Sequence, residues 1–223
     1  MTIRSTTTVP LVIWGASGHA LVVAEIVRQH SPYEIAGFID NVNPSRKGEA
    51  FCDSTILGGE EALDWMKSQG ILHIALGFGH CSGRLAVATR VRAMGFALPT
   101  LVHASAVVVS TAVVGEGTVV MPGAIISAAC RIGSACIVNS GAIVCHECTV
   151  GDGTHICPGV SIGGRTRIGA RSWIGIGSTL RDKLTIGDAT LVGAGSVVVR
   201  DLPDRVVAYG NPAGIQGPAD NEF

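Results

Sequence analysis

The chain has 223 residues, of which 47% are hydrophobic, 15% charged and only 4% aromatic, and its formal net charge is −1. The apolar fraction suffices for a packed core, which excludes a largely disordered chain, and no basic excess indicates a nucleic-acid surface. The longest apolar run near the N-terminus, residues 9–14, is too short to span a bilayer and lacks the flanks of a signal peptide. Seven cysteines without a secretory context indicate reduced thiols, so we expect a cytoplasmic protein.

Short apolar runs alternate with helical patterns over the first hundred residues. The expected elements, in chain order, are a strand at 9–14, a helix at 20–29, a strand at 35–40, a helix at 60–68, a strand at 71–77 and a helix at 82–94. Strands that alternate with helices form a parallel sheet. Residues 1–100 are therefore predicted to form a Rossmann-like α/β domain.

The turn after the first expected strand, residues 15–20, has the sequence GASGHA. In an open parallel sheet this turn is the usual ligand position, and its glycines let a phosphate approach the N-terminus of the next helix. The turn departs from the GxGxxG fingerprint, so a tight turn without a ligand is the alternative. Asp40, at the end of the second expected strand, either holds a ribose or base edge or caps a turn.

The second half of the chain repeats every six residues. Every sixth residue over 114–198 is Val, Ile or Leu, and a second ladder over 118–196 is small everywhere except at Val160 and Leu184. A period of six fits neither a lone helix nor a lone strand, but it fits a short strand and a tight turn repeated as a β-helix. The pattern thus predicts a solenoid in which each coil buries its neighbours.

Glycines recur every eighteen residues, at Gly115, Gly133, Gly151, Gly169 and Gly187. Three sixes per coil would stack these glycines at one corner of a triangular prism, where a residue without Cβ tolerates the turn. Adjacent coils would lie about 4.8 Å apart, with the aliphatic side chains in columns inside. Residues 101–223 are therefore predicted to form the β-helix domain with a C-terminal tail.

Taken together, these segments resemble the bacterial sugar O- and N-acetyltransferases of the hexapeptide-repeat superfamily, typified by UDP-4-amino-sugar (bacillosamine pathway) N-acetyltransferase and sialic acid O-acetyltransferase. The resemblance covers GASGHA, GFID at 37–40, the hexapeptide array and GNPA at 210–213. Its most specific part is HECTVGDGTH at 146–155. The resemblance implies a left-handed β-helix, a homotrimer, acetyl-CoA bound in clefts between neighbouring prisms, and no metal.

The resemblance also implies roles for individual residues. His146 matches the catalytic base and Glu147 the acidic residue beside it. The implied cofactor positions are His155, Gly164, Ile176 and Ala194, and the implied sugar-nucleotide pocket consists of Ser17, Gly18, His19, Asp40, Asn41 and Gly77. The chain departs from its relatives at GFGHCSGR, residues 77–84, where they often carry an Asn-rich turn, and at Gly214, where Lys or Arg is common.

The spacing of these residues suits acyl transfer. Histidine is a natural base near neutral pH, and a neighbouring carboxylate can orient its ring. Gly164 lies eighteen residues after His146, one coil away, where it would leave room for a thioester and offer an N–H to the oxyanion. His155 lies half a coil from His146, so one subunit would place the two on different faces. They could share a site only across a subunit boundary.

Three rival functions belong to other classes. A zinc enzyme of the γ-carbonic anhydrase type uses the same repeat but needs three convergent histidines, whereas the array offers His146 and His155, with His103 at its start. An NAD-dependent oxidoreductase would explain only the front turn, and a non-catalytic scaffold would leave the His–Glu–Gly register unexplained. Cys145 and Cys148 form a CxxC, but Cys148 falls on the small-residue ladder and is expected to pack inside.

The sequence therefore predicts an acetyl-CoA-dependent N-acetyltransferase that acts on the amino group of a nucleotide-linked amino sugar by direct transfer. A sugar or sialic acid O-acetyltransferase is the alternative, because related enzymes differ in the atom that they acylate. The preference for nitrogen rests on the HECTVGDGTH segment. The sequence leaves open which sugar, which nucleotide base and which acyl chain length the enzyme uses.

Overall fold

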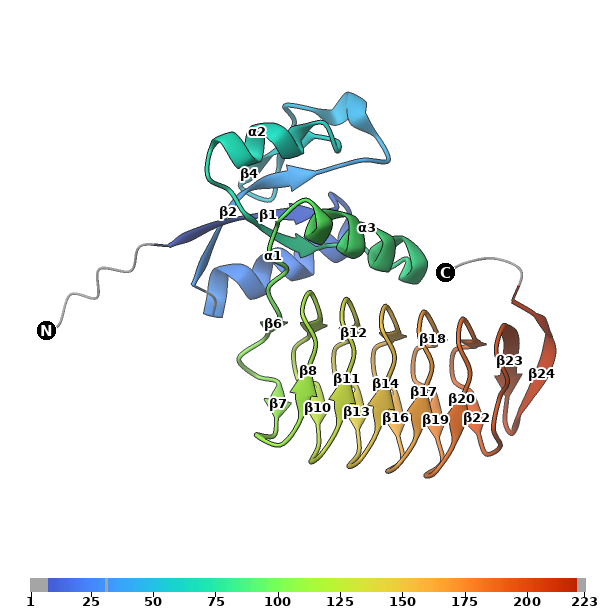
Figure 1. The fold of residues 1–223 in the computed structure, drawn as a ribbon. Helices are drawn as coiled ribbons and strands as arrows, with labels where there is room; N and C mark the ends of the chain where they lie inside the picture. The colour runs from blue at the N-terminus through green and yellow to red at the C-terminus, as the bar shows by residue number, and fades with distance from the viewer. Residues whose placement is uncertain (1–7, 31, 220–223) are drawn as a thin grey trace, which may run out of the picture.

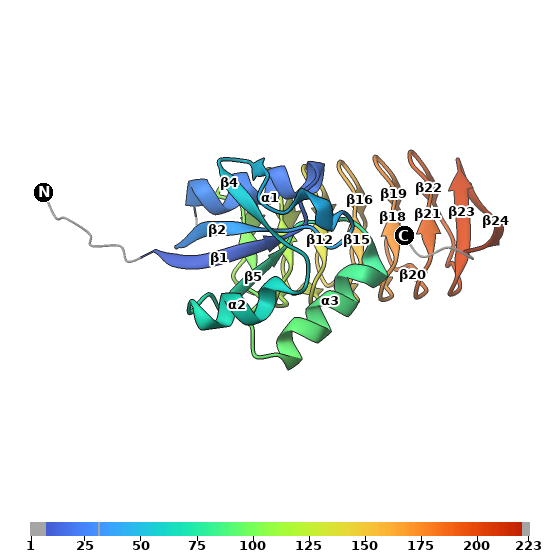
Figure 2. The ribbon, with the colours of Figure 1, turned by 90° about the horizontal axis from the view of Figure 1, so that it is seen from above.

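The computed structural model describes residues 8–30 and 32–219. An α/β front domain lies against one side of a long triangular prism (Figure 1). Seen from above, the front domain covers the N-terminal coils of the prism, and the C-terminal coils project beyond it (Figure 2). The chain passes from the last front helix, which ends at Ala93, to the first prism strand, which begins at Leu101.

The front domain contains a five-stranded sheet of order β3-β4-β2-β1-β5, in which β1 pairs in parallel with both β2 and β5. Its elements are β1 (Val9–Trp14), α1 (Gly18–His30), β2 (Tyr33–Ile39), a 3₁₀ turn (Pro44–Arg46), β3 (Ala50–Phe51), β4 (Ser54–Gly58), α2 (Ala62–Ser68), β5 (His73–Leu76) and α3 (Cys81–Ala93). The parallel core and all six predicted elements are present, with ends that differ from the prediction by at most two residues.

The β3–β4 hairpin was not predicted. Its turn consists of Cys52 and Asp53, which both have left-handed backbone conformations with φ of 51° and 57°. Such two-residue turns usually carry Asn-Gly or Asp-Gly, so a Cys-Asp pair gives no recognisable signal. The hairpin extends the sheet beyond β2, and its strand β4 contacts the 3₁₀ turn.

The prism has three parallel faces. The covered face, beneath the front domain, comprises β6 (Leu101–Val102), β9 (Val119–Val120), β12 (Ile137–Val138), β15 (His155–Ile156), β18 (Trp173–Ile174) and β21 (Leu191–Val192), and continues into β23 (Val206–Gly210) and β24 (Ala213–Pro218). The first open face comprises β7 (Val107–Val108), β10 (Ile125–Ile126), β13 (Ile143–Val144), β16 (Ser161–Ile162), β19 (Thr179–Leu180) and β22 (Val197–Val198). The second open face comprises β8 (Val113–Val114), β11 (Arg131–Ile132), β14 (Thr149–Val150), β17 (Arg167–Ile168) and β20 (Thr185–Ile186).

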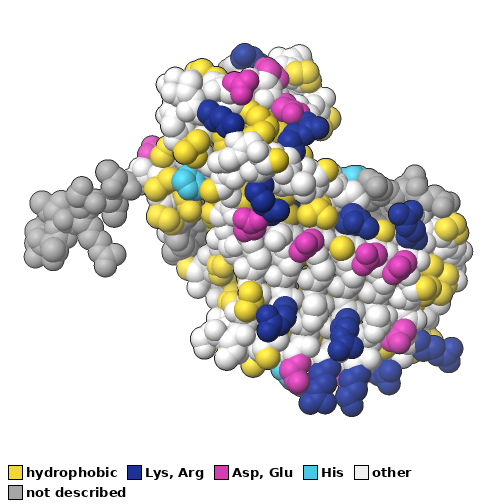
Figure 3. Space-filling model, viewed as in Figure 1, with side chains coloured by type: hydrophobic (Ala, Val, Ile, Leu, Met, Phe, Trp, Pro, Cys, Tyr) yellow, Lys and Arg dark blue, Asp and Glu magenta, His cyan; other side chains and the backbone are white. Residues whose placement is uncertain are grey.

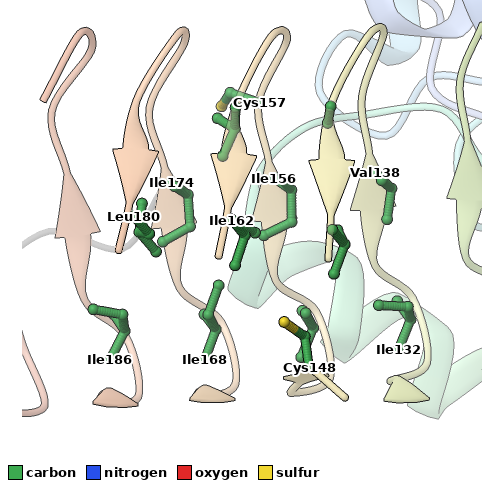
Figure 4. Close-up of a cluster of buried hydrophobic side chains, with 14 of the residues drawn as sticks. Ile132, Val138, Cys148, Ile156, Cys157, Ile162, Ile168, Ile174, Leu180 and Ile186 are labelled. Carbon is green, nitrogen blue, oxygen red and sulfur yellow. The ribbon is translucent and has the colours of Figure 1, made fainter. Parts of the chain in front are cut away.

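The strands pair with a register of eighteen residues, as the repeat predicts; Ile125, for example, pairs with Ile143, and Ile143 with Ser161. The aliphatic ladder residues over 120–198 are at most 3% exposed, and they stack in columns inside the prism (Figure 4). The small ladder is also buried, and most of its polar side chains donate to carbonyls fifteen residues later, as Thr118 Oγ1 does to Gly133 O at 2.7 Å. These bonds satisfy polar groups that would otherwise be costly to bury.

The glycines spaced by eighteen are required for a different reason from the predicted one. A Cβ on Gly115 would lie 2.6 Å from the backbone of Gly133, so the close stacking of coils excludes a side chain there. The left-handed turn positions instead recur every six residues over 117–195, and half of them carry residues other than glycine. Glu147 and Arg165 occupy two of these positions, with φ of 60° and 61°.

Candidate active site

The predicted catalytic residues lie on the open corner of the prism, which we define as the turns between the first and second open faces at residues 127–129, 145–147, 163–165 and 181–183. The side chain of His146 is 57% exposed there, and its Nδ1 lies 2.9 Å from Glu147 Oε2. A Cβ on Gly164 would lie 2.7 Å from His146 Cε1 and Nε2. The predicted one-coil register is therefore present, but the imidazole ring fills the space that was expected to hold a thioester.

The contact with Glu147 fixes the tautomer of His146. A carboxylate only accepts hydrogen bonds, so Nδ1 carries the proton and Nε2 is left as the basic nitrogen. Glu147 Oε2 also accepts a bond from Arg165 Nε at 3.0 Å. The bond from Arg165 and, second, the bond from His146 lower the pKa of Glu147 below its ordinary value. The carboxylate thus stays ionised at neutral pH, as an orienting group must.

A cavity of about 480 Å³ opens in the front domain beside the ends of β1 and β2. Its lining includes three residues of the predicted sugar-nucleotide pocket, Ser17, Asp40 and Asn41, together with aromatic surfaces of Trp14 and Phe78. This volume falls within the range of small-molecule sites, and the position at the carboxyl ends of parallel strands is the usual one. The glycine turn therefore borders a ligand-sized cavity.

Asp40 serves as a turn cap in this cavity. Its Oδ1 accepts the N–H groups of Val42 and Asn43 at 3.1 and 3.0 Å, and its Oδ2 lies 2.9 Å from Arg46 Nη1. Arg46 Nη1 also donates to Ala16 O at 2.9 Å, so it ties the glycine turn to the end of β2. Both carboxylate oxygens of Asp40 are engaged, and sequence reasoning missed the Arg46 guanidinium as a lining group.

The three remaining pocket candidates do not line the cavity. Gly18 begins α1, and the ring of His19 lies 6.3 Å from that of His155, on the side of the prism. Gly77 is a packing residue, because a Cβ there would lie 2.6 Å from Ile13 Cγ2.

His155 lies on β15 beneath the front domain and is 5% exposed. Its ring packs edge-on against Trp173, with 4.4 Å between centroids, and its Nε2 lies 3.0 Å from Asn139 Nδ2. Burial, and secondarily the charge of Arg84, lower the pKa of His155 to about 3 and that of His19 to about 4. Both rings are neutral at pH 7, so His155 can form hydrogen bonds there but cannot act as an imidazolium acid.

Arg84, on α3, joins the two parts of the molecule. It is fully buried and donates to Ala135 O and Gly153 O of the prism, each at 2.7 Å, and to Gly79 O after β5 at 2.6 Å. The guanidinium therefore holds the turn after β5, which contributes Phe78 to the cavity, against the covered face. Sequence reasoning missed this role because a buried arginine looks like an exposed one in a helical pattern.

The predicted cofactor positions fall on two corners of one chain. Gly164 belongs to the open corner, whereas Ile176 and Ala194 are exposed one coil apart on the corner between the covered face and the first open face. The first open face separates the two corners, so a single chain does not bring these residues together. The histidines 146 and 155 are likewise on different sides, as their spacing predicts.

Within residues 8–30 and 32–219, no group of three His, Cys, Asp or Glu side chains is placed to hold a metal ion.

The seven cysteines are free thiols, and burial raises the pKa of Cys148, inside the prism as predicted, to about 11. No helix in the described part of the chain combines the length and apolar character needed to cross a membrane.

A ligand-sized cavity in a Rossmann-like domain, packed on a hexapeptide-repeat prism that bears a His–carboxylate pair, defines an acyltransferase of the hexapeptide-repeat class. Residues 10–91 match the family described as the PglD N-terminal domain. The fold is similar to perosamine N-acetyltransferase from Caulobacter crescentus, whose variant structure contains CoA and GDP-perosamine, with 37% identity over 93% of this chain and 97% of that chain and a TM-score of 0.89. The acetyltransferase domain of PglB from Neisseria gonorrhoeae matches with 35% identity over 92% of this chain and 98% of that chain and a TM-score of 0.87.

A curated enzyme, dTDP-3-amino-3,6-dideoxy-α-D-galactopyranose 3-N-acetyltransferase from Aneurinibacillus thermoaerophilus, is 70% identical over 27 residues, which span 12% of this chain and 14% of that enzyme. The chain belongs to the hexapeptide-repeat family of sugar N-acetyltransferases, which share the left-handed β-helix and use acetyl-CoA.

Proposed function

We propose that this enzyme transfers the acetyl group of acetyl-CoA to the amino group of a nucleotide-linked amino sugar, with His146 as general base. The observation that carries the proposal is the His146–Glu147 pair stacked on Gly164 in the same chain as the front cavity. Relatives described as N-acetyltransferases of GDP-perosamine and of a dTDP-linked amino sugar support the acceptor class.

The proposed chemistry uses the orientation of the pair. The amine of the sugar attacks the thioester carbonyl, its proton passes to His146 Nε2, and the C–S bond breaks as the CoA thiolate leaves and takes up a proton. Glu147 holds the Nδ1 proton and stabilises the imidazolium that forms during attack. The N–H of Gly164 is the proposed donor to the oxyanion, because those of Gly163 and Arg165 already donate to Leu180 O and His146 O.

The front cavity is the proposed nucleotide site. Trp14 and Phe78 offer apolar surface to a base or sugar, and Arg46, which is paired with Asp40 and Glu49, holds the rim of the cavity in place. His19 Nε2 is buried without a hydrogen-bond partner among the described residues, at the junction with the prism. The sugar would extend from the cavity across this junction toward the prism, where acetyl-CoA is proposed to bind.

We propose further that the active enzyme is a homotrimer in the cytoplasm. The first open face carries an exposed aliphatic stripe of Val107, Ile125 and Ile143, which are 54%, 36% and 36% exposed and suit burial against another prism. A neighbouring subunit could bring its open corner beside Ile176 and Ala194 of this one and so complete the split cofactor site. Free thiols suit a reducing compartment.

The shared-site proposal has a direct test. His146→Asn and His155→Asn chains are each expected to be inactive alone. When the two are unfolded, mixed and refolded together, a fraction of the boundaries would carry both intact histidines, and part of the activity should return. Mixed oligomers that stay inactive would contradict a site shared between subunits.

The function itself is tested by thiol release from acetyl-CoA with UDP-, dTDP- and GDP-linked 4-amino sugars and with free sialic acid. We expect turnover on a nucleotide-linked amino sugar and a loss of about 10²-fold or more in kcat in folded His146→Asn, as for removal of a general base. Turnover on sialic acid alone would move the reaction to oxygen. Turnover retained in His146→Asn would refute the assignment of the base.

A further inference from the structure

The environment of Glu147 contains a third residue. Arg165 follows Gly164 on the next coil, and its Nε lies 3.0 Å from the same Oε2 atom that accepts the bond from His146 Nδ1. Arg165 N also donates to His146 O at 2.9 Å. One carboxylate oxygen of Glu147 thus lies between the His146 ring N–H and the Arg165 guanidinium N–H. The backbone of Arg165 is also hydrogen-bonded to that of His146.

The backbone of the open corner makes this arrangement specific. The left-handed positions of successive coils stack in one column, which carries Ala129, Glu147, Arg165 and Lys183. Neighbouring coils lie about 4.8 Å apart, so an acid and a base in this column face one another by construction. The αL conformation is unfavourable for residues other than glycine, yet both partners adopt it.

The other charged groups of the corner do not replace this contact. The next coil carries an exposed Arg181 together with Asp182 and Lys183, and the last two lie 3.9 Å apart and pair with one another. On the preceding coil the corner carries Ala128 and Ala129, which are uncharged. Within the corner, Cys145 is the only other titratable neighbour in sequence, and its side chain is half-buried. Lys and Arg side chains gather along the lower edge of the prism toward its C-terminal coils (Figure 3).

We infer that Arg165 is a positioning residue for the reaction, which clamps Glu147 against His146 and limits the negative charge that the imidazole experiences. The inference rests on the proposed function for its catalytic meaning. Exposed ion pairs contribute little to stability, and both partners are about half exposed, so the effect of Arg165 lies in the position and charge of the carboxylate.

The charge effect has a definite sign. Glu147 alone favours the protonated imidazolium, whereas the nearby guanidinium opposes it. Removing the guanidinium makes the ring easier to protonate, and the base is then lost at a higher pH. Because the His146 and Arg165 side chains are both more than half exposed, solvent screens the interaction, and the expected displacement is about half a pH unit.

The test compares Arg165→Gln, Arg165→Lys and the matched control Arg167→Gln, which removes an exposed arginine two residues away on β17. We expect the acid limb of the kcat/KM profile to move up by about half a pH unit in Arg165→Gln and to stay in place in Arg165→Lys and Arg167→Gln. At a pH above the limb, kcat should fall in both Arg165 variants, because each loses the planar N–H, while the KM for acetyl-CoA changes little.

A readout without turnover separates this inference from the proposed function. Titration of the His146 ring by NMR, assigned with His146→Asn, should give a midpoint about half a pH unit higher in Arg165→Gln than in the wild type or Arg167→Gln. An unmoved midpoint would overturn the inference, whether or not the enzyme acetylates an amino sugar. So would a raised KM for acetyl-CoA with an unmoved limb, since Arg165 would then contact the cofactor. If the His146 midpoint is displaced but the enzyme transfers no acetyl group, the result would count against the proposed function alone.

Discussion

Replacement of Arg84 by methionine should destabilise the whole molecule. The variant keeps an unbranched chain of similar length but removes three hydrogen bonds of 2.6–2.7 Å to buried carbonyls of Gly79, Ala135 and Gly153. Hydrogen bonds from charged donors contribute about 1.5–3 kcal/mol each, and the buried guanidinium regains part of its hydration in the unfolded chain. The net loss should be about 3–5 kcal/mol, the usual cost of breaking a buried charged network.

The assay is urea unfolding at fixed protein concentration, followed by circular dichroism. Arg90→Met is the matched control, because Arg90 lies on the same helix, is 58% exposed and pairs only with Glu60 among the described residues; it should cost less than about 1 kcal/mol. Arg84→Lys keeps the charge with fewer donors in a different geometry and should fall between the two. An Arg84→Met midpoint equal to that of Arg90→Met would refute the view that Arg84 joins the front domain to the prism.

Two further predictions concern the histidines. The folded pKa values of His155 and His19, about 3 and about 4, lie below the ordinary 6.5. Between these values the unfolded chain binds more protons than the folded one. The free energy of unfolding is therefore highest above pH 6.5 and falls as the pH drops toward 4. At pH 5 each neutral buried ring should lower the free energy of unfolding by about 2 kcal/mol. The fall in melting temperature between pH 7.5 and 5 should therefore be smaller in His155→Gln than in the wild type. Equal falls in the wild type and the variant would contradict the burial argument. Gly164→Ala places a methyl group 2.7 Å from the His146 ring and should lower kcat by about tenfold or more without unfolding the prism. The control Gly217→Ala, whose methyl group would meet open space, should keep its kcat. Normal turnover in Gly164→Ala would show that the ring need not lie over residue 164.

The prism was predictable because its physics is local and repeated. A six-residue period specifies which side chains point inward, and eighteen residues per coil specify the neighbour of each, so the burial of Ile156 or Cys148 and the stacking of Gly164 under His146 follow from counting. The alternating strands and helices of the front domain were predictable for a similar reason. Element ends and the β3–β4 turn at Cys52 and Asp53 were not, since unusual residues occupy its left-handed positions.

The site was predictable only where sequence spacing equals spatial spacing. Contacts between the front domain and the prism join residues with unrelated positions in the repeat, so no pattern announced that Arg84 would bond to Gly153 or that His19 would lie near His155. The ion pair between Asp40 and Arg46 depends on the path of the loop that joins them, which no sequence pattern specifies. Arg165 could have been found, because it lies eighteen residues after Glu147 in the same column.

The proposed reaction joins acetyl to an amine of a nucleotide-linked sugar. It is tested most directly by incubating the enzyme with acetyl-CoA and a GDP-, UDP- or dTDP-linked amino sugar and identifying the product by mass spectrometry before and after hydroxylamine treatment. We predict a nucleotide sugar heavier by one acetyl group that survives hydroxylamine as an amide and is absent with His146→Asn. A product whose acetyl group is removed by hydroxylamine would place the reaction on oxygen, and no acetylated nucleotide sugar with any acceptor would contradict the proposed function.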